Sequence, residues 1–164
     1  SSCDRIYSMA LVHEKLYQSE SFAQIDFGAY IDSIVQQLFS IYAQDKYIEK
    51  RIHVNDIAVD LTLATPCGLI LNELITNSLM HAFPDQESGR IEISAVQNET
   101  GDLELTYSDN GVGIAEELRL SDQRATLGLS LIHILSHQIG AKIELNTHSG
   151  YWLRLRIPKK PNAV

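Results

Sequence analysis

The sequence predicts an α+β fold in which a layer of helices packs on a sheet of mostly hairpin-linked strands, a two-layer sandwich. Two observations predict this class. Stretches with apolar residues at three- and four-residue spacing, which indicate amphipathic helices, recur along the chain. Between them lie short runs in which apolar and polar residues alternate, as they do in strands. A chain of 164 residues suffices for one such domain with a sizeable core.

Two helices are expected first. Residues 4–19 carry a single apolar stripe, and a helix this short needs a partner to be stable. Residues 19–27 read as a linker with a short extended piece. Asp26 is placed to cap a second amphipathic helix over residues 28–44.

The middle of the chain is predicted to hold the central helix. Two strands precede it, over residues 48–54 and, with a weaker pattern, 58–63. Thr65 then stands where a helix cap belongs, with Pro66 at the first helical position, where its missing N–H costs little. Pro84 is expected to end the helix.

Two hairpins and a third helix complete the expected domain. The predicted elements are, in order, a strand over 90–96, a strand over 103–108, a polar surface loop over 114–126, a helix over 127–139 ending at Gly140, and strands over 142–147 and 151–157. A short basic tail begins at Pro158.

Composition excludes several classes of protein. The net charge of -8 argues against broad binding to nucleic acids or anionic membranes. No apolar run approaches the roughly 20 residues of a membrane span, and no signal peptide is recognisable. The two cysteines are too few for a disulfide framework or a zinc site, and Cys67 is expected to be a small buried hydrophobe. These features favour a cytoplasmic domain, whose parent protein could be membrane-anchored.

One polar row stands out on the central helix. Glu73, Asn77 and His81 are four residues apart and therefore share a face. A carboxylate and a carboxamide one turn apart offer oxygen ligands that suit Mg²⁺ carrying a nucleotide. Downstream, the turn over 109–113 (Asp-Asn-Gly-Val-Gly) adds a second carboxylate, and its glycines let the backbone come close to a ligand.

These residues carry a resemblance to a known family. Residues 66–83 resemble the N box, and residues 109–113 the first glycine box, of the Bergerat-fold (GHKL) ATPases, which include sensor histidine kinases, type II topoisomerases, ninety-kilodalton heat-shock chaperones and mismatch-repair ATPases. Residues 71–84 are similar to the histidine kinase subfamily called HisKA_2, and residues 5–17 resemble the end of its dimerisation hairpin.

The resemblance implies a role for each polar residue. It places the metal-binding asparagine at Asn77 and a glutamate that polarises or orients the attacking group at Glu73. Alternatively Glu73 is a solvated side chain and the neighbouring Asn72 is its functional counterpart. Asp109 resembles the aspartate that accepts a hydrogen bond from the amino group of adenine, and His81 occupies a position near the nucleotide.

The family pattern also implies how the pocket is closed. Gly111 and Gly113 would form its edge and the hinge of a closing loop. Residues 126–130 resemble the second glycine box, so Thr126, Leu127 and Gly128 would contact the nucleotide, with Gly128 opening a helix whose amides favour phosphate. Arg124, or Arg119 in the same loop, would neutralise the terminal phosphate. Met80 departs from the pattern, because the family usually has a lysine there.

The resemblance implies the ATP-binding catalytic domain (residues 21–160, with a tail over 161–164) of a HisKA_2-type sensor histidine kinase, preceded over 1–20 by the end of its dimerisation hairpin. ATP with Mg²⁺ would donate its γ-phosphoryl group to a histidine on an upstream helix, and a response-regulator receiver domain would take it next. A homodimer of the full-length protein is implied. The alternatives are a degenerate nucleotide-binding or dimerisation module that regulates a partner, or another GHKL ATPase or serine kinase.

Overall fold

The computed structural model describes residues 10, 24–84, 88–113 and 123–159, with the backbone alone defined over 123–126. Apart from residue 10, the expected helix over 4–19 therefore lies outside the described residues, as do loop residues 114–122. The described helices and strands are β1 (Ile25–Asp26), α2 (Phe27–Tyr42), β2 (Tyr47–Val54), β3 (Ala58–Val59), α3 (Leu61–Asn77), the π-helix η1 (Ser78–Ala82), β4 (Ser88–Gln97), β5 (Leu103–Asp109), α5 (Gln123–Gln138), β6 (Lys142–Asn146) and β7 (Trp152–Ile157).

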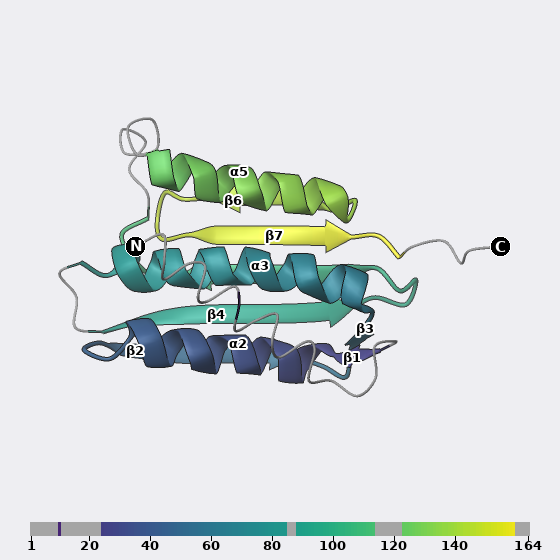
Figure 1. Ribbon diagram of the computed structural model, residues 1–164, viewed down its shortest axis with the longest axis horizontal. Helices are drawn as coiled ribbons and strands as arrows, with labels where there is room; N and C mark the ends of the chain where they lie inside the picture. Colours follow the sequence, from purple (N-terminus) through teal and green to yellow (C-terminus); the bar gives the residue numbers. More distant parts are fainter. Residues whose placement is uncertain (1–9, 11–23, 85–87, 114–122, 160–164) are drawn as a thin grey trace.

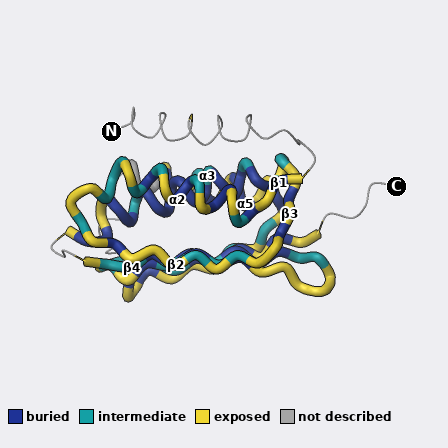
Figure 2. The backbone as a smooth tube through the Cα atoms, turned by 90° about the horizontal axis from the view of Figure 1, so that it is seen from below, coloured by how far each residue is buried: buried dark blue, intermediate teal, exposed yellow. Residues whose placement is uncertain are grey.

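One five-stranded sheet, ordered β2-β4-β5-β7-β6, forms one of the two layers of the fold. Strands β2 and β4 pair in parallel, because β3, α3 and η1 cross over between them, and the other neighbouring pairs are antiparallel. Figure 2 shows the helices on one side of this sheet. The predicted two-layer α+β sandwich is therefore confirmed.

The two faces of the sheet differ in chemistry. Along β5, Leu103, Leu105 and Tyr107 are buried against the helices. On the opposite face, Arg154 of β7 donates to the Glu144 carboxylate of β6 at 2.7 Å. Because strand side chains alternate between faces, this pattern places the apolar core between the sheet and helices α2, α3 and α5, which lie over the strands in Figure 1.

Helix α3 begins earlier than its sequence suggests. Asp60, rather than Thr65, is its N-cap, and its carboxylate accepts a hydrogen bond from the amide of Leu63 at 3.0 Å. Pro66 is consequently inside the helix and not at its first position. The proposed strand over 58–63 shrinks to β3, because Asp60 ends the extended backbone and satisfies the first helical amides instead.

A π-helix continues α3 towards the site. η1 spans Ser78–Ala82, and the helical run ends just before Pro84, as predicted. π-Helical turns are rare and often occur at functional sites. Here the π-turn carries Ser78 and His81, which both line the pocket described below.

Helix α5 also begins earlier than predicted, at Gln123 instead of Leu127. Its end is confirmed: Gly140 has a φ of 68° and, with Ala141, returns amide hydrogen bonds to the last turn. The two hairpins β4–β5 and β6–β7 match the predicted strands to within two residues at each end. Among the described residues no helix combines the length and the apolar composition that crossing a membrane requires.

Candidate functional site

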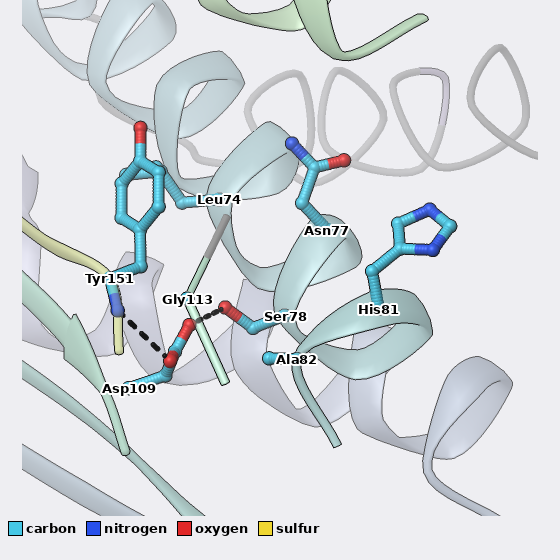
Figure 3. Close-up of a pocket in the computed structure, with 8 residues that line it drawn as sticks. All are labelled: Leu74, Asn77, Ser78, His81, Ala82, Asp109, Gly113 and Tyr151. Carbon is cyan, nitrogen blue, oxygen red and sulfur yellow. Dashed lines mark hydrogen bonds between the residues drawn. The ribbon is translucent and has the colours of Figure 1, made fainter. Parts of the chain in front are cut away.

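A pocket lies where the end of α3, η1 and the end of β5 meet. The described residues that line it are Leu74, Asn77, Ser78, His81, Ala82, Asp109, Gly113 and Tyr151, drawn in Figure 3. Asn77 and Asp109, 32 positions apart in the sequence, thus open onto one cavity. The cavity has a volume of about 50 Å³, room for the edge of a planar ring or a few water molecules. A larger ligand would extend from it past Asn77 and His81.

Asp109 is buried and firmly held at the inner end of this pocket. It is 8% exposed, and its Oδ1 accepts hydrogen bonds from the amides of Gly111 at 2.9 Å and Tyr151 at 3.1 Å. Its Oδ2 accepts from the Ser78 hydroxyl at 2.5 Å. An ionised carboxylate can only accept hydrogen bonds, so a ligand at this end must bring a donor.

Tyr151 and Ser78 were not expected in the site. Tyr151 pairs with Asp109 in both directions, since the Asp109 amide also donates to the Tyr151 carbonyl at 2.9 Å. No local signal indicates a contact across 42 positions of the sequence. Ser78 carries a weak signal, because it directly follows Asn77 on the same helical run.

Asn77 and His81 lie towards the mouth of the pocket. Both line it, with Asn77 partly buried and His81 exposed (Figure 3). None of the lining residues that the structure describes is a lysine or an arginine. Met80, at the position where the family pattern has its lysine, is 44% exposed. The described wall therefore offers carboxamide and imidazole groups to a phosphate, and no full positive charge.

Glu73 points to helix α5 instead of the described cavity. It is 3% exposed, and a Cβ atom placed on Gly128 would lie 2.9 Å from Glu73 Oε2 and 3.6 Å from Asn77 Nδ2. Gly128 is thus brought beside both predicted residues. However, the prediction that Gly128 opens a helix is wrong, because it lies in the second turn of α5, where its amide bonds within the helix. Its missing side chain lets the two helices approach instead.

Asn72 faces the protein interior. It is 1% exposed and does not line the pocket; its Oδ1 accepts a hydrogen bond from Thr76 at 3.4 Å. Its Nδ2 is buried without a hydrogen-bond partner among the described residues. The contribution of Asn72 to ligand binding stays a prediction.

The glycines after Asp109 fit only as glycines. A Cβ on Gly111 would come within 2.4 Å of the Ala82 carbonyl oxygen. Gly113 has a φ of 72°, and a Cβ there would be 2.3 Å from the Thr147 carbonyl oxygen. Both glycines therefore let the turn pack against its neighbours, while their part in closing a loop stays a prediction.

The remaining predicted ligands lie at the start of α5. Leu127 is 67% exposed, so the structure does not bring it into the described pocket. Arg124 and Thr126 belong to the first turn of α5, but their side chains are outside the described residues, as is all of Arg119.

The donor set suits a nucleotide with its metal. The acceptor-only carboxylate of Asp109 fits an amino group on a ring edge. No cluster of three or more metal-binding side chains occurs in the part of the chain that the structure describes. Mg²⁺ commonly takes one or two protein ligands and completes its shell with phosphates and water, so Asn77 alone is compatible with it.

Comparison with known proteins supports this assignment. Residues 63–161 match the family described as histidine kinase-, DNA gyrase B-, and HSP90-like ATPase, and residues 1–42 match the histidine kinase family HisKA_2. Blue-light-activated histidine kinase 2 of Erythrobacter litoralis is 29% identical over 126 residues, covering 77% of this chain and 35% of that protein. Sensor histidine kinase PdtaS of Mycobacterium tuberculosis is 26% identical over 139 residues, covering 82% and 26%.

A solved structure agrees in fold. The histidine kinase domain of the Erythrobacter litoralis EL346 blue-light activated histidine kinase superposes with a TM-score of 0.77 at 24% identity, covering 94% of this chain and 72% of that one. The chain spans about a third or less of the length of the curated relatives named above. The long match over the central and C-terminal residues shows that the chain belongs to the family of histidine kinase-, DNA gyrase B-, and HSP90-like ATPases.

Proposed function

We propose that this chain is the ATP-binding catalytic domain of a sensor histidine kinase. One observation carries the proposal: Asn77 and Asp109, the residues expected to hold the metal and to read the base, line a single pocket. Two relatives that are named as histidine kinases support it. The parent protein would act in the cytoplasm as a homodimer.

In this proposal each end of the pocket has a task. The Asp109 carboxylate accepts a hydrogen bond from the exocyclic amine of adenine, a group that guanine replaces with a carbonyl. The Asn77 carboxamide binds Mg²⁺ together with the phosphates. The metal supplies charge that stabilises the transferring phosphoryl group. The role of Glu73 as a base, or in orienting the attacking group, rests on the family resemblance, because its side chain points to α5.

The proposed reaction is a phosphoryl transfer. The bond between the γ-phosphorus and the β–γ bridging oxygen of ATP breaks, and a bond from that phosphorus to a histidine nitrogen on the hairpin helix forms. ADP leaves, and an aspartate of a response-regulator receiver domain is the next acceptor. The domain contributes positioning and charge stabilisation, which suffices for this chemistry.

Calorimetry with Mg²⁺ and a non-hydrolysable ATP analogue tests the site. Asp109→Asn should abolish the preference for adenine, because it places an amide donor near the amino group of the base. Asn77→Ala should remove the dependence of binding on Mg²⁺. If both variants bind like the parent, the assignment of the pocket is wrong.

Transfer tests the activity separately. Radiolabelled ATP is mixed with this chain and a supplied HisKA_2 hairpin that carries the acceptor histidine. Acid-labile label on the hairpin supports the kinase proposal. Nucleotide binding without transfer would instead favour the regulatory module, for which the absence of a lysine at Met80 is the motivating feature.

A further inference from the structure

A buried hydrogen-bonded chain runs from the core to the wall of the pocket. Tyr107 precedes Asp109 by two residues on β5, so both side chains lie on the helix side of the sheet. The Tyr107 hydroxyl is 2.6 Å from Ser78 Oγ and 3.1 Å from the Leu74 carbonyl oxygen. Ser78 Oγ in turn lies 2.5 Å from Asp109 Oδ2 (Figure 3). Tyr107 and Ser78 are 0% and 4% exposed, so no bulk water competes for these bonds.

The donors available fix the direction of the chain. Ionised Asp109 can only accept, so Ser78 gives it the single hydroxyl hydrogen. Ser78 Oγ is then left as the acceptor for the hydroxyl of Tyr107. Burial, with the negative charge of Asp109 as the second cause, raises the pKa of Tyr107 well above its ordinary value. The Tyr107 hydroxyl therefore keeps its hydrogen and remains a donor.

Tyr107 also competes with the usual alternative for a helical serine. A serine in a helix often turns its hydroxyl back to the carbonyl four residues earlier, which for Ser78 is that of Leu74. The Tyr107 hydroxyl lies within hydrogen-bonding distance of both groups. That hydroxyl has a single hydrogen, which it gives to Ser78 Oγ at the shorter distance and can only share with the Leu74 carbonyl, so the hydrogen of Ser78 is left for Asp109.

We infer that Tyr107 is a positioning residue for base selection, which acts through Ser78 to hold the Asp109 carboxylate in its adenine-reading orientation. The inference rests on the proposed function. Of the four acceptor positions of the carboxylate, the amides of Gly111 and Tyr151 take two and Ser78 takes a third. The one left, on Oδ2, is presented to the ligand. When the hydrogen bond from Ser78 is weakened, the carboxylate turns. Its hydrogen bond to an adenine amine and its repulsion of a guanine carbonyl both become weaker.

The test is the ratio of dissociation constants for Mg·ATP and Mg·GTP, measured by calorimetry on the whole chain. Tyr107→Phe should reduce the preference for ATP by about tenfold, because the turned carboxylate would lose about one charged hydrogen bond, the one from the adenine amine. Ser78→Ala should reduce it similarly. The double variant should match either single variant, since Tyr107 acts only through Ser78.

Tyr30→Phe is the matched control. It also removes a buried tyrosine hydroxyl next to α3, but away from the residues that line the pocket. It should leave the ratio unchanged, and a fall in the ratio would overturn the inference by showing that any such hydroxyl disturbs the site.

Two further results would overturn it: an unchanged ratio in Tyr107→Phe, whether or not ATP and GTP binding weaken equally, or effects of the two variants that add. Should Tyr107→Phe fail to fold, an unchanged ratio in Ser78→Ala would still overturn the inference, because Tyr107 is inferred to act through Ser78. The proposed function fails separately, if the parent binds no ATP or does not prefer it to GTP. An intact preference in the Tyr107 and Ser78 variants, together with its loss in Asp109→Asn, would leave the proposed function standing without this inference.

Discussion

Two buried tyrosines contact the α3–η1 run from different sides, and only one of them is connected to the pocket. Tyr107 reaches it from the sheet, and its hydroxyl bonds to Ser78. Tyr30 reaches it from α2, and its hydroxyl is buried without a hydrogen-bond partner among the described residues. There the helix offers Gly68, where an added Cβ would lie only 1.9 Å from the Tyr30 hydroxyl oxygen.

The difference separates packing from ligand recognition on one helical run. On the α2 side, the small residues Cys67 and Gly68 let a large ring come close, and the polar atom of that ring is tolerated. On the sheet side, a serine takes the hydroxyl into a chain that ends on Asp109. A buried polar group without a partner costs free energy, and the chain from Tyr107 through Ser78 to Asp109 avoids that cost beside the pocket.

Alkaline pH should produce the largest effect, on both sides of the comparison. Burial raises the pKa of Cys67 from 9.0 to about 12, and burial likewise raises the pKa of Tyr30 and Tyr107. Since the folded state holds these protons more tightly, their contribution to stability is complete below the unfolded pKa values and is lost as pH rises. For Cys67 the window is from 9.0 to about 12. Each group should lower the free energy of unfolding by about 1.4 kcal/mol per pH unit within its window.

Urea unfolding at a series of pH values above 8.5 measures this slope, starting about half a unit below the ordinary thiol value. Cys67→Ala should reduce the slope of the unfolding free energy against pH by the contribution of one titrating group. The cavity that it leaves should also lower the stability at every pH. A parent whose stability does not change across this range would show that these groups do not titrate with folding.

Gly68→Ala should have the next largest effect. Alanine gains up to about 1 kcal/mol over glycine inside a helix, but overpacking a core costs about 1–3 kcal/mol or more. Since the added Cβ would meet the rigid, buried ring of Tyr30 at 1.9 Å, the clash should win and the net loss should be about 2 kcal/mol. Urea unfolding measures it.

The double variant Gly68→Ala with Tyr30→Phe sharpens this result. Removing the hydroxyl leaves the ring carbon Cζ at 2.8 Å from the new Cβ, so part of the loss should be recovered. If the stability effects of the two changes simply added, the new Cβ would not clash with the Tyr30 side chain. Nucleotide binding should be unaffected in each variant.

The sequence predicts the pocket better than it predicts the groups that hold it. Asn77 and Asp109 could be found because each lies in a short local motif, and their meeting in one cavity is confirmed. Tyr107 does carry a signal in the sequence: it lies two residues before Asp109 on an alternating strand, so the two side chains face the same side of the sheet. Tyr151 depends on the pairing of β5 with β7, which no local pattern specifies.

Helix starts show a second limit of local patterns. Thr65 followed by Pro66 reads as a cap, yet Asp60 caps α3. Asp and Thr are both good caps, and the choice between them depends on how much of the next turn can be buried. Ala64 is 0% exposed, so the additional turn extends the helix over the core. The early start of α5 changes the meaning of Gly128 in the same way, from a helix-opening residue to a contact with Glu73.

Tyr107→Phe should lower stability moderately, by about 1–2 kcal/mol, the range for one buried hydrogen bond with part of its desolvation cost. The ring keeps its edge-on contact with Tyr151, whose centroid lies 6.4 Å away. Unfolding in urea without nucleotide gives the value. An unchanged stability would mean that the hydrogen bonds of the Tyr107 hydroxyl to Ser78 and Leu74 do not stabilise the folded state.

Tyr30→Phe should have the smallest effect, within about 0.5 kcal/mol of the parent and on the stabilising side, because it removes a buried polar atom that has no hydrogen-bond partner in the described part of the chain. The phenylalanine ring preserves the packing against α3, and it relieves the contact near Gly68. Measured under the same conditions as Tyr107→Phe, it separates the stability that comes from hydrogen-bond partners from the stability that comes from the aromatic ring. If Tyr30→Phe were as costly as Tyr107→Phe, the hydrogen bonds of the Tyr107 hydroxyl would not distinguish the two sides of the helix in stability.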